Sequence, residues 1–290
     1  MNKKKSIFLI SIIALICSCT LTGQSTSEPE SIVNTDTPVP VASSTPLPSA
    51  TDAPSATPQD TPTALPVLRQ VPMTLMINQP KSSFDSVAFL EEFITLIEEE
   101  DLQVVTYRDL SDEPALTATH AGKLMVITID NIFLQIPINK GVMQMIDLLK
   151  QAGYPAVLGI ITEGDRVDPE TLATLVELQD LGWEIASNTD TYRNLLEVQQ
   201  SAPKTIALEI DTSLDKLMTA CGIRPITLIL PYGEMIDKDE QIKRTDVEWV
   251  VGIYGGESYD TSAAYYYVGR QSPAGTAQQT FELMKQRFTP

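Results

Sequence analysis

Histidine is nearly missing from this chain, since His120 is the only one among 290 residues. It lies in a polar stretch just ahead of an apolar run, and we interpret it as a solvated loop residue. Zinc-like ions are held by imidazole and carboxylate groups in most proteins. A single isolated histidine therefore excludes a metal site built on two or more imidazoles.

Cysteine is also scarce, and the three present are Cys17, Cys19 and Cys221. The first two lie in the N-terminal apolar segment, which leaves Cys221 as the one thiol expected in the folded domain. No disulfide is therefore expected there, and stability must come from an ordinary core. Cys221 ends a helical pattern just before Gly222, which predicts a small buried apolar residue rather than a nucleophile.

Positive charge is outweighed by negative charge. The chain has 20 Lys and Arg against 38 Asp and Glu, giving a formal net charge of -18 at pH 7. This balance argues against nucleic acid and anionic polymers as partners and is compatible with a neutral or cation-bridged glycan. No glycine-rich phosphate loop follows any predicted strand, which disfavours nucleotide binding.

The N-terminus predicts export and lipid anchoring. Lys3, Lys4 and Lys5 precede the apolar run Ile7–Ile16, and Cys19 follows a small residue, Ser18. We predict that residues 1–19 are a lipoprotein signal peptide with a lipobox and that Cys19 is acylated. The alternative is an ordinary cleaved signal. The expected location is the bacterial cell envelope, outside the cytoplasm and anchored to the membrane.

Residues 20–66 differ sharply in composition from the rest of the chain. From Gln24 onward they are mainly Ser, Thr, Pro and Ala with scattered acids. Too few apolar side chains are present to offset the entropy of ordering. This segment is predicted to be a disordered, semi-stiff tether that holds the domain away from the membrane.

Residues 67–290 predict one domain of the α/β class. Apolar runs alternate with helix-period patterns, and the runs are nearly continuous in apolar residues, as parallel strands covered by helices are. Gly153, Gly182 and Gly222 each follow a helical pattern, and Asp168 has the position of an N-cap. The pattern is typical of an α/β barrel or an open doubly wound sheet. The predicted strands are Met73–Ile77, Gln103–Tyr107, Leu124–Ile129, Ala156–Ile161, Trp183–Ser187, Ile226–Leu230 and Trp249–Ile253.

Polar residues follow three of these strands, where α/β folds carry their chemistry. We expect the three clusters to share one rim of the fold and to contain the ligand-binding residues. They are Asp130 and Asn131 after Leu124–Ile129; Asn188, Asp190 and Tyr192 after Trp183–Ser187; and Pro231, Tyr232 and Gly233 after Ile226–Leu230.

Five segments match, in order, the conserved segments of one known family: Val71–Met73, Val104–Leu110, Val126–Asn131, Gly182–Tyr192 and Leu230–Gly233. Through these segments the chain resembles the polysaccharide deacetylase (NodB homology) family over residues 71–288. Among them, Thr128-Ile129-Asp130-Asn131 is similar to the family's Thr-Phe-Asp-Asp motif. Leu230-Pro231-Tyr232-Gly233 matches its Pro-Tyr-Gly motif. The resemblance implies a deformed (β/α) barrel of about seven parallel strands and a carbohydrate deacetylase that uses a divalent metal such as zinc.

This sequence departs from the family at the metal site. The resemblance implies that Asp130 keeps the position of the general base. Asn131 stands where the family has a metal-binding aspartate, and Asn188 and Tyr192 stand where it has two histidines. Neutral amide and phenol oxygens are poor ligands for zinc-like ions, so we expect no metal cofactor. Asp190 is a second charged candidate at a variable position of the motif.

Two functions from different classes remain open. The first is a catalytically degenerate domain on the cell surface that binds a neutral glycan or another envelope protein. The second is an active carbohydrate de-N/O-acetylase that uses Asp130 with a non-standard metal or none. A structural spacer is a third reading. The interpretations without a function are that Asp130 caps a turn, Asn131 and Asn188 are turn residues, and Tyr192 packs in the space left by the missing metal ligands.

Overall fold

The computed structural model describes residues 71–288, except 82, 121, 203–204, 235, 237–241, 243–245 and 256–264. All of these residues belong to the compact unit Gln59–Pro290. The predictions for the signal peptide, Cys19 and the tether therefore lie outside the described residues. Among the described helices, none is both long and apolar enough to cross a membrane.

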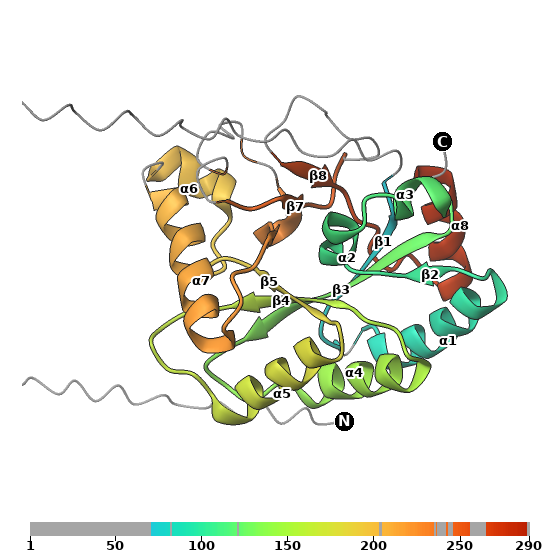
Figure 1. The fold of residues 1–290 in the computed structure, drawn as a ribbon, viewed down its shortest axis with the longest axis horizontal. Helices are drawn as coiled ribbons and strands as arrows, with labels where there is room; N and C mark the ends of the chain where they lie inside the picture. The colour runs from blue at the N-terminus through green and yellow to red at the C-terminus, as the bar shows by residue number, and fades with distance from the viewer. Residues whose placement is uncertain are drawn as a thin grey trace, which may run out of the picture. The chain divides into compact units, whose positions relative to one another are not determined.

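The strands form a nearly closed parallel barrel, which confirms the predicted fold class (Figure 1). Seven strands follow one another around the barrel in the order β1-β3-β4-β5-β6-β7-β8, and β2 pairs with the first two residues of β3. Closure is made where Gln271, just after β8, bonds to β1 through Met76 N–Gln271 O at 2.9 Å and Gln271 N–Thr74 O at 2.8 Å. The strands are β1 (Met73–Ile77), β2 (Gln103–Val104), β3 (Leu124–Phe133), β4 (Val157–Ile161), β5 (Glu184–Ser187), β6 (Thr227–Ile229), β7 (Trp249–Val251) and β8 (Tyr266–Val268).

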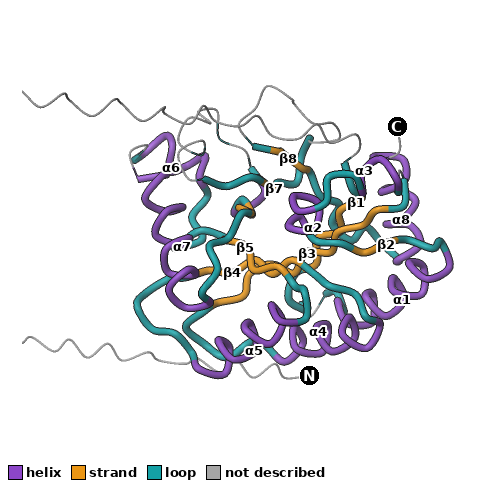
Figure 2. Tube along the Cα trace, viewed as in Figure 1, coloured by secondary structure: helices purple, strands orange, loops and turns teal. Residues whose placement is uncertain are grey.

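Helices lie around the outside of the strands, as Figure 2 shows in purple around orange. Their inward faces carry the apolar residues predicted by the helical periodicity, such as Phe93 in α1 and Val142 in α4. The described helices are α1 (Ser86–Glu99), α2 (Tyr107–Asp112), α3 (Leu116–Thr119), α4 (Lys140–Ala152), α5 (Pro169–Asp180), α6 (Leu195–Ser201), α7 (Ile206–Cys221), the 3-10 turn η2 (Pro231–Gly233) and α8 (Ala277–Phe288).

The predicted ends of the helices are confirmed. Gly153 and Gly222 are left-handed C-caps with φ of 75° and 76°, and Gly182 has a φ of 85° one residue after the cap of α5. The Asp168 carboxylate accepts a hydrogen bond from Thr171 N at 3.0 Å and so caps α5. Local chemistry at these positions decides where the elements stop.

Two predicted strands differ most from the structure, and the other differences are one or two residues at an end. The run Gln103–Tyr107 is a strand only over Gln103–Val104, because Thr106 and Asp109 form a capping box and Tyr107 begins α2. β3 runs past Ile129 to Phe133, so Asp130 and Asn131 lie inside the strand rather than after it.

The extension of β3 contains a bulge. Ile129 pairs with Leu158 and Ile132 pairs with Ile160, so two residues of β3 oppose the single residue Gly159 of β4. A Cβ on Gly159 would lie 3.4 Å from the Asp130 carboxylate oxygen and 3.0 Å from Ile229. The bulge and the missing side chain together make room for Asp130 inside the barrel.

Candidate functional site

The site predicted from the sequence lies at the carboxyl ends of β3, β5 and β6. The bulge of β3 supplies Asp130 and Asn131, the segment after β5 supplies Asn188 and Tyr192, and η2 supplies Tyr232. Parallel strands bring their carboxyl ends to one rim, so these side chains lie together. Asp190 and Pro231 are placed differently, as described below.

Asp130 is buried and paired with Arg270, which follows β8. The Arg270 Nη1 donates to both carboxylate oxygens at 2.8 and 2.7 Å, and also to Thr128 Oγ1 at 2.9 Å. Its Nε donates to the Gly252 carbonyl at 3.0 Å. Asp130 is 5 % exposed and Arg270 is 1 % exposed. A positive charge therefore lies against Asp130, the one carboxylate at the matched base and metal-ligand positions of the family motifs.

Asn131 has a left-handed backbone, with a φ of 65°. Its Nδ2 donates to Asn78 Oδ1 at 3.2 Å, and its carbonyl accepts from Gln79 Nε2 at 2.8 Å. Within the described residues, its buried Oδ1 has no hydrogen-bond partner. Asparagine tolerates this backbone conformation better than most residues, so the bulge itself favours Asn131.

Asn188 is almost fully buried at the end of β5. Its Nδ2 donates to the Ile229 carbonyl at 3.0 Å, which ties β5 to β6. In the described part of the chain, the Oδ1 of Asn188 and the hydroxyl of Thr189 are buried without partners. Buried polar atoms are usually hydrogen-bonded, and exceptions gather where a structure has a function or holds water.

Tyr192 and Tyr232 form an aromatic pair over this rim. Their ring centroids are 5.2 Å apart and their planes are inclined by 33°. Burial raises the pKa of the Tyr192 phenol, and the nearby Asp130 charge acts in the same direction. The Tyr192 hydroxyl also interacts with the Asn131 side chain. Tyr192 therefore connects the buried residues to the surface, where Tyr232 is 57 % exposed.

Backbone strain is concentrated at this rim. Among the described residues, six that are not glycine have a positive φ, and four of them are Asn131, Thr189, Tyr192 and Tyr232. A β-branched or aromatic side chain in this region costs on the order of 1–3 kcal/mol, and such residues cluster at functional sites. The strain supports a functional interpretation of the rim without specifying the chemistry.

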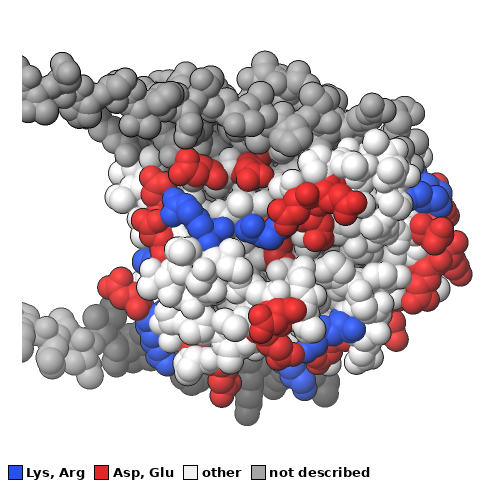
Figure 3. Space-filling view, in the orientation of Figure 1, with Lys and Arg blue, Asp and Glu red and all other residues white. Residues whose placement is uncertain are grey.

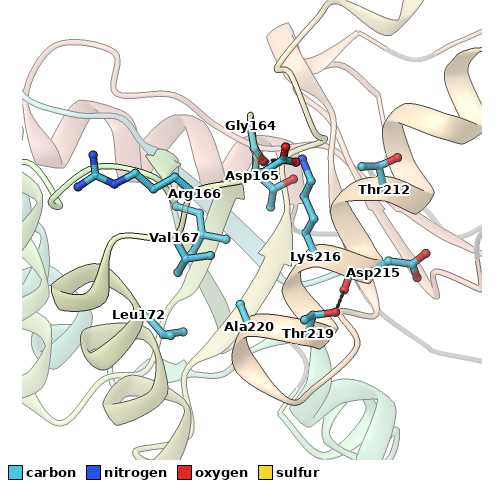
Figure 4. Close-up of a pocket in the computed structure, with 12 residues that line it drawn as sticks. Gly164, Asp165, Arg166, Val167, Leu172, Thr212, Asp215, Lys216, Thr219 and Ala220 are labelled. Atoms are coloured by element: carbon cyan, nitrogen blue, oxygen red, sulfur yellow. Dashed lines mark hydrogen bonds between the residues drawn. The ribbon is translucent and has the colours of Figure 1, made fainter.

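Asp190 belongs to a different network. Its Oδ1 accepts from Thr162 Oγ1 and from Lys216 Nζ, both at 2.8 Å. Lys216 also donates to the carbonyls of Thr162 and Gly164 at 3.0 and 2.7 Å. Figure 4 shows Lys216 extending from α7 toward Gly164 in a cavity of about 570 Å³ between α7 and the start of α5. Pro231 is buried at the start of η2 and acts in the turn.

A second cavity, of about 580 Å³, opens beside the aromatic pair. It is lined by Tyr192, Tyr232, Glu163 from the segment after β4, and Glu197 in the first turn of α6. Its volume lies in the range of small-molecule sites, which is about 300–1,000 Å³. Neither Asp130 nor Asn188 lines this cavity, because both are buried beneath the rim.

The residues at the rim do not fit a zinc-like ion. They offer two amide oxygens, a phenol whose pKa is raised, and one carboxylate that is already bonded to Arg270. In the described part of the chain, no three His, Cys, Asp or Glu residues are grouped so that they could hold a metal. Such ions prefer imidazole, thiolate or free carboxylate ligands.

Sequence reasoning missed Arg270, which contacts Asp130 beneath the rim, and Lys216, which belongs to the separate network of Asp190. Arg270 follows the apolar residues of β8, and a charged residue at the carboxyl end of a strand was the available signal. Its partner lies 140 residues earlier in the chain, and the pairing depends on barrel closure. Cys221 is half-buried, and burial raises the pKa of its thiol to about 11, which agrees with an unreactive residue.

Comparison with known proteins identifies the domain. Residues 117–247 match the model of the polysaccharide deacetylase family. No curated protein matches the chain. The chain therefore contains a polysaccharide deacetylase-like domain, which confirms the resemblance seen in its motifs.

Solved structures agree on the fold. The deacetylase PplD of Streptococcus pyogenes, in complex with acetate, is 16% identical, with a TM-score of 0.60 over 77% of this chain and 100% of that chain. IcaB from Ammonifex degensii is 14% identical, with a TM-score of 0.58 over 75% and 97%. A polysaccharide deacetylase from Bacillus cereus is 17% identical, with a TM-score of 0.56 over 75% and 69%. At these identities the likeness shows the fold alone.

Proposed function

We propose that this protein is a cell-surface lipoprotein whose polysaccharide deacetylase-like domain binds glycan without metal-dependent hydrolysis. The observation that carries the proposal is the donor set at the rim. Asn131, Asn188 and Tyr192 stand at the ligand positions of the family motifs, and the Asn188 amide nitrogen is bonded to the Ile229 carbonyl. Hydrolysis of an amide or ester by a metal requires a cation that polarises the carbonyl and activates water.

The Asp130–Arg270 pair supports the same proposal. A general base must lie within hydrogen-bond reach of the proton that it abstracts. Both carboxylate oxygens of Asp130 already accept from Arg270 Nη1, which occupies the positions that an attacking water would need. Burial of the pair also separates it from the cavity in which a substrate would lie.

A binding role is supported by the open cavity and the exposed Tyr232. Tyrosine presents a large apolar surface and a polar tip, and it is frequent where proteins bind polar ligands. The excess of acidic residues disfavours an anionic polymer as the ligand. A glycan of the envelope is therefore the proposed partner, and an envelope protein is the alternative. The predicted acylation of Cys19 would place the domain at that surface.

One observation favours the second candidate, an active deacetylase or esterase. The oxygens of Asn131 and Asn188 are buried and unpartnered within the described residues, and Asp130 is retained beside them. Oxygens of this kind can position a water molecule for attack. The candidate needs Asp130 to act as a base despite its contact with Arg270.

The test is hydrolysis compared with binding on the full-length protein. Acetate release would be measured with acetylated sugar oligomers and an aryl acetate, with and without added zinc or cobalt. We expect no release above background, less than one metal ion in ten protein molecules, and measurable binding of oligomers by calorimetry. Asp180→Asn, which removes an exposed carboxylate from the end of α5, is the matched control. Turnover that is abolished by Asp130→Asn but kept by Asp180→Asn would overturn the proposal.

A further inference from the structure

The cavity beside the aromatic pair has a chemistry of its own, distinct from the buried residues beneath it. Its walls come from the segment after β4, the segment after β5, helix α6 and η2. These are neighbouring positions on the carboxyl rim of the barrel, so the cavity is supported by several rigid elements. Its volume of about 580 Å³ suits a short segment of an oligosaccharide.

We infer that this cavity binds a glycan unit bearing a protonated amine, such as an amino sugar without its acetyl group. The inference rests on the proposed glycan-binding function and specifies the class of glycan. It is carried by the tyrosine pair and by two carboxylates, Glu163 and Glu197, that line the same space.

The two carboxylates are available for a ligand. Glu163 and Glu197 are both exposed, and the described residues give neither side chain a hydrogen bond or an ion pair. A third acid nearby, Glu234, is already bonded to Asn194 Nδ2 at 2.7 Å. Arg193 also lines the cavity, so its walls carry one guanidinium and these two carboxylates. The balance at the walls therefore favours a cation.

The tyrosine pair favours the same class of ligand. The face of an aromatic ring carries negative charge density, and a cation over a tyrosine ring is stabilised by about 0.5–2 kcal/mol. The rings of Tyr192 and Tyr232 lie 5.2 Å apart and both residues line the cavity, so the cavity has an aromatic surface on this side. A sugar ring packs its apolar face on such a surface while its amine reaches a carboxylate.

The charge of the whole protein agrees with this assignment. A net charge of -18 attracts cationic polymers and repels anionic ones. Figure 3 shows Asp and Glu in several groups across the face in view, with Lys and Arg in smaller groups. A neutral N-acetylated unit lacks the charge attraction to either carboxylate, so affinity for the two kinds of oligomer separates the possibilities.

The experiment is calorimetric titration of the full-length protein with glucosamine oligomers and with fully N-acetylated oligomers of equal length. We expect the amine-bearing oligomer to bind at least tenfold more tightly at low salt and to weaken as salt is added. Glu163→Gln and Glu197→Gln should each weaken its binding three- to tenfold, and Tyr232→Ala should weaken binding of both oligomers. Glu99→Gln, an exposed acid at the end of α1, is the matched control and should change neither.

Equal affinity for both oligomers, a preference for the N-acetylated one, or no effect of either glutamate variant would overturn this inference. Those results leave the proposed non-catalytic glycan binding in place as long as some oligomer binds without acetate release. Metal-dependent acetate release would overturn the proposed function, whatever the charge preference. The absence of binding to both oligomers would overturn both.

Discussion

At the scale of single residues, Asp130 and Arg270 form a buried ion pair beneath the rim. Each side chain is a buried charge whose removal from water is costly, and the attraction between the two offsets that cost only while both are present. Arg270 satisfies four acceptors at once: both oxygens of Asp130, the Thr128 hydroxyl and the Gly252 carbonyl. The pair therefore joins β3 to the end of β8 across the barrel.

We expect Asp130→Ala and Arg270→Ala each to lower the free energy of unfolding by about 3–5 kcal/mol, because each leaves an unpaired buried charge. The double variant Asp130→Ala, Arg270→Ala should lose less than the sum of the two single changes. Chemical denaturation of the four proteins measures this coupling. Additive losses would contradict a direct interaction between the two side chains.

At the scale of secondary-structure elements, the ends of the helices depend on single residues. Gly222 ends α7 with a φ of 76°, and a Cβ at this position would meet no atom within 4 Å. A substitution there therefore tests backbone conformation alone, without a steric clash.

Gly222→Ala is expected to lower the free energy of unfolding by about 1 kcal/mol, because alanine is strained in the left-handed region. Gly222→Asn should cost less, since asparagine adopts this conformation more readily. Thermal and denaturant unfolding of the two variants would measure the difference. A larger loss for asparagine than for alanine would contradict the backbone explanation.

Glu184 connects three elements at the amino end of the barrel. Its carboxylate accepts from Arg108 N at the start of α2, at 3.0 Å, and from Thr227 Oγ1 of β6, at 2.5 Å. Burial raises the pKa of this carboxyl to about 7, although Thr227 and Arg108 act in the opposite direction. Arg108 and Asp109 of α2 are the charged groups that act on it.

This raised pKa makes stability depend on pH. Between its ordinary pKa of 4.5 and about 7, the folded protein keeps a proton on Glu184 that the unfolded chain has lost. The stabilisation is fully present below pH 4.5, falls by roughly 3 kcal/mol as pH rises toward 7, and then stays constant. Denaturation at a series of pH values should show this fall in the natural protein. Glu184→Gln should lack it, and parallel curves for the two would refute the assignment.

At the scale of the whole molecule, most of the architecture could be predicted from the sequence. Strands buried on both faces are continuous apolar runs, and β1, with all five residues buried, has the bounds expected from Met73–Ile77. Trp183 and Trp249, at the starts of two predicted strands, are also buried in the core. These features follow from the burial of apolar side chains, which a short run of apolar residues is enough to predict.

The details of the site could not be predicted in the same way. The bulge at Asp130 depends on the register between β3 and β4, which the chain does not encode in any short segment. The partner of Asp130 and the contact between the Tyr192 and Tyr232 rings both depend on segments distant in sequence. The sequence motifs predicted which residues lie at the rim. Tertiary contacts determine the chemical environment of those residues.

The predicted attachment to the membrane can be tested on the intact chain. We expect the full-length protein to fractionate with membranes and to incorporate a labelled fatty acid when it is produced in a bacterial host. Cys19→Ala should abolish labelling and release the protein, because the acyl chains supply the membrane affinity. Cys221→Ala is the control and should change neither. Labelling that persists without Cys19 would refute the lipobox prediction.

The closure of the barrel has a consequence for how the domain opens. β1 pairs with β3 along five residues, but it meets the chain after β8 through only two backbone hydrogen bonds at Gln271. Local fluctuations expose the weakest joins first. The amide hydrogens of Met76 and Gln271 should therefore exchange with deuterated solvent well before those of Ile127 and Leu158, with the rest of the sheet still protected. The barrel would then open between β1 and the segment after β8, while the other strand pairs stay hydrogen-bonded.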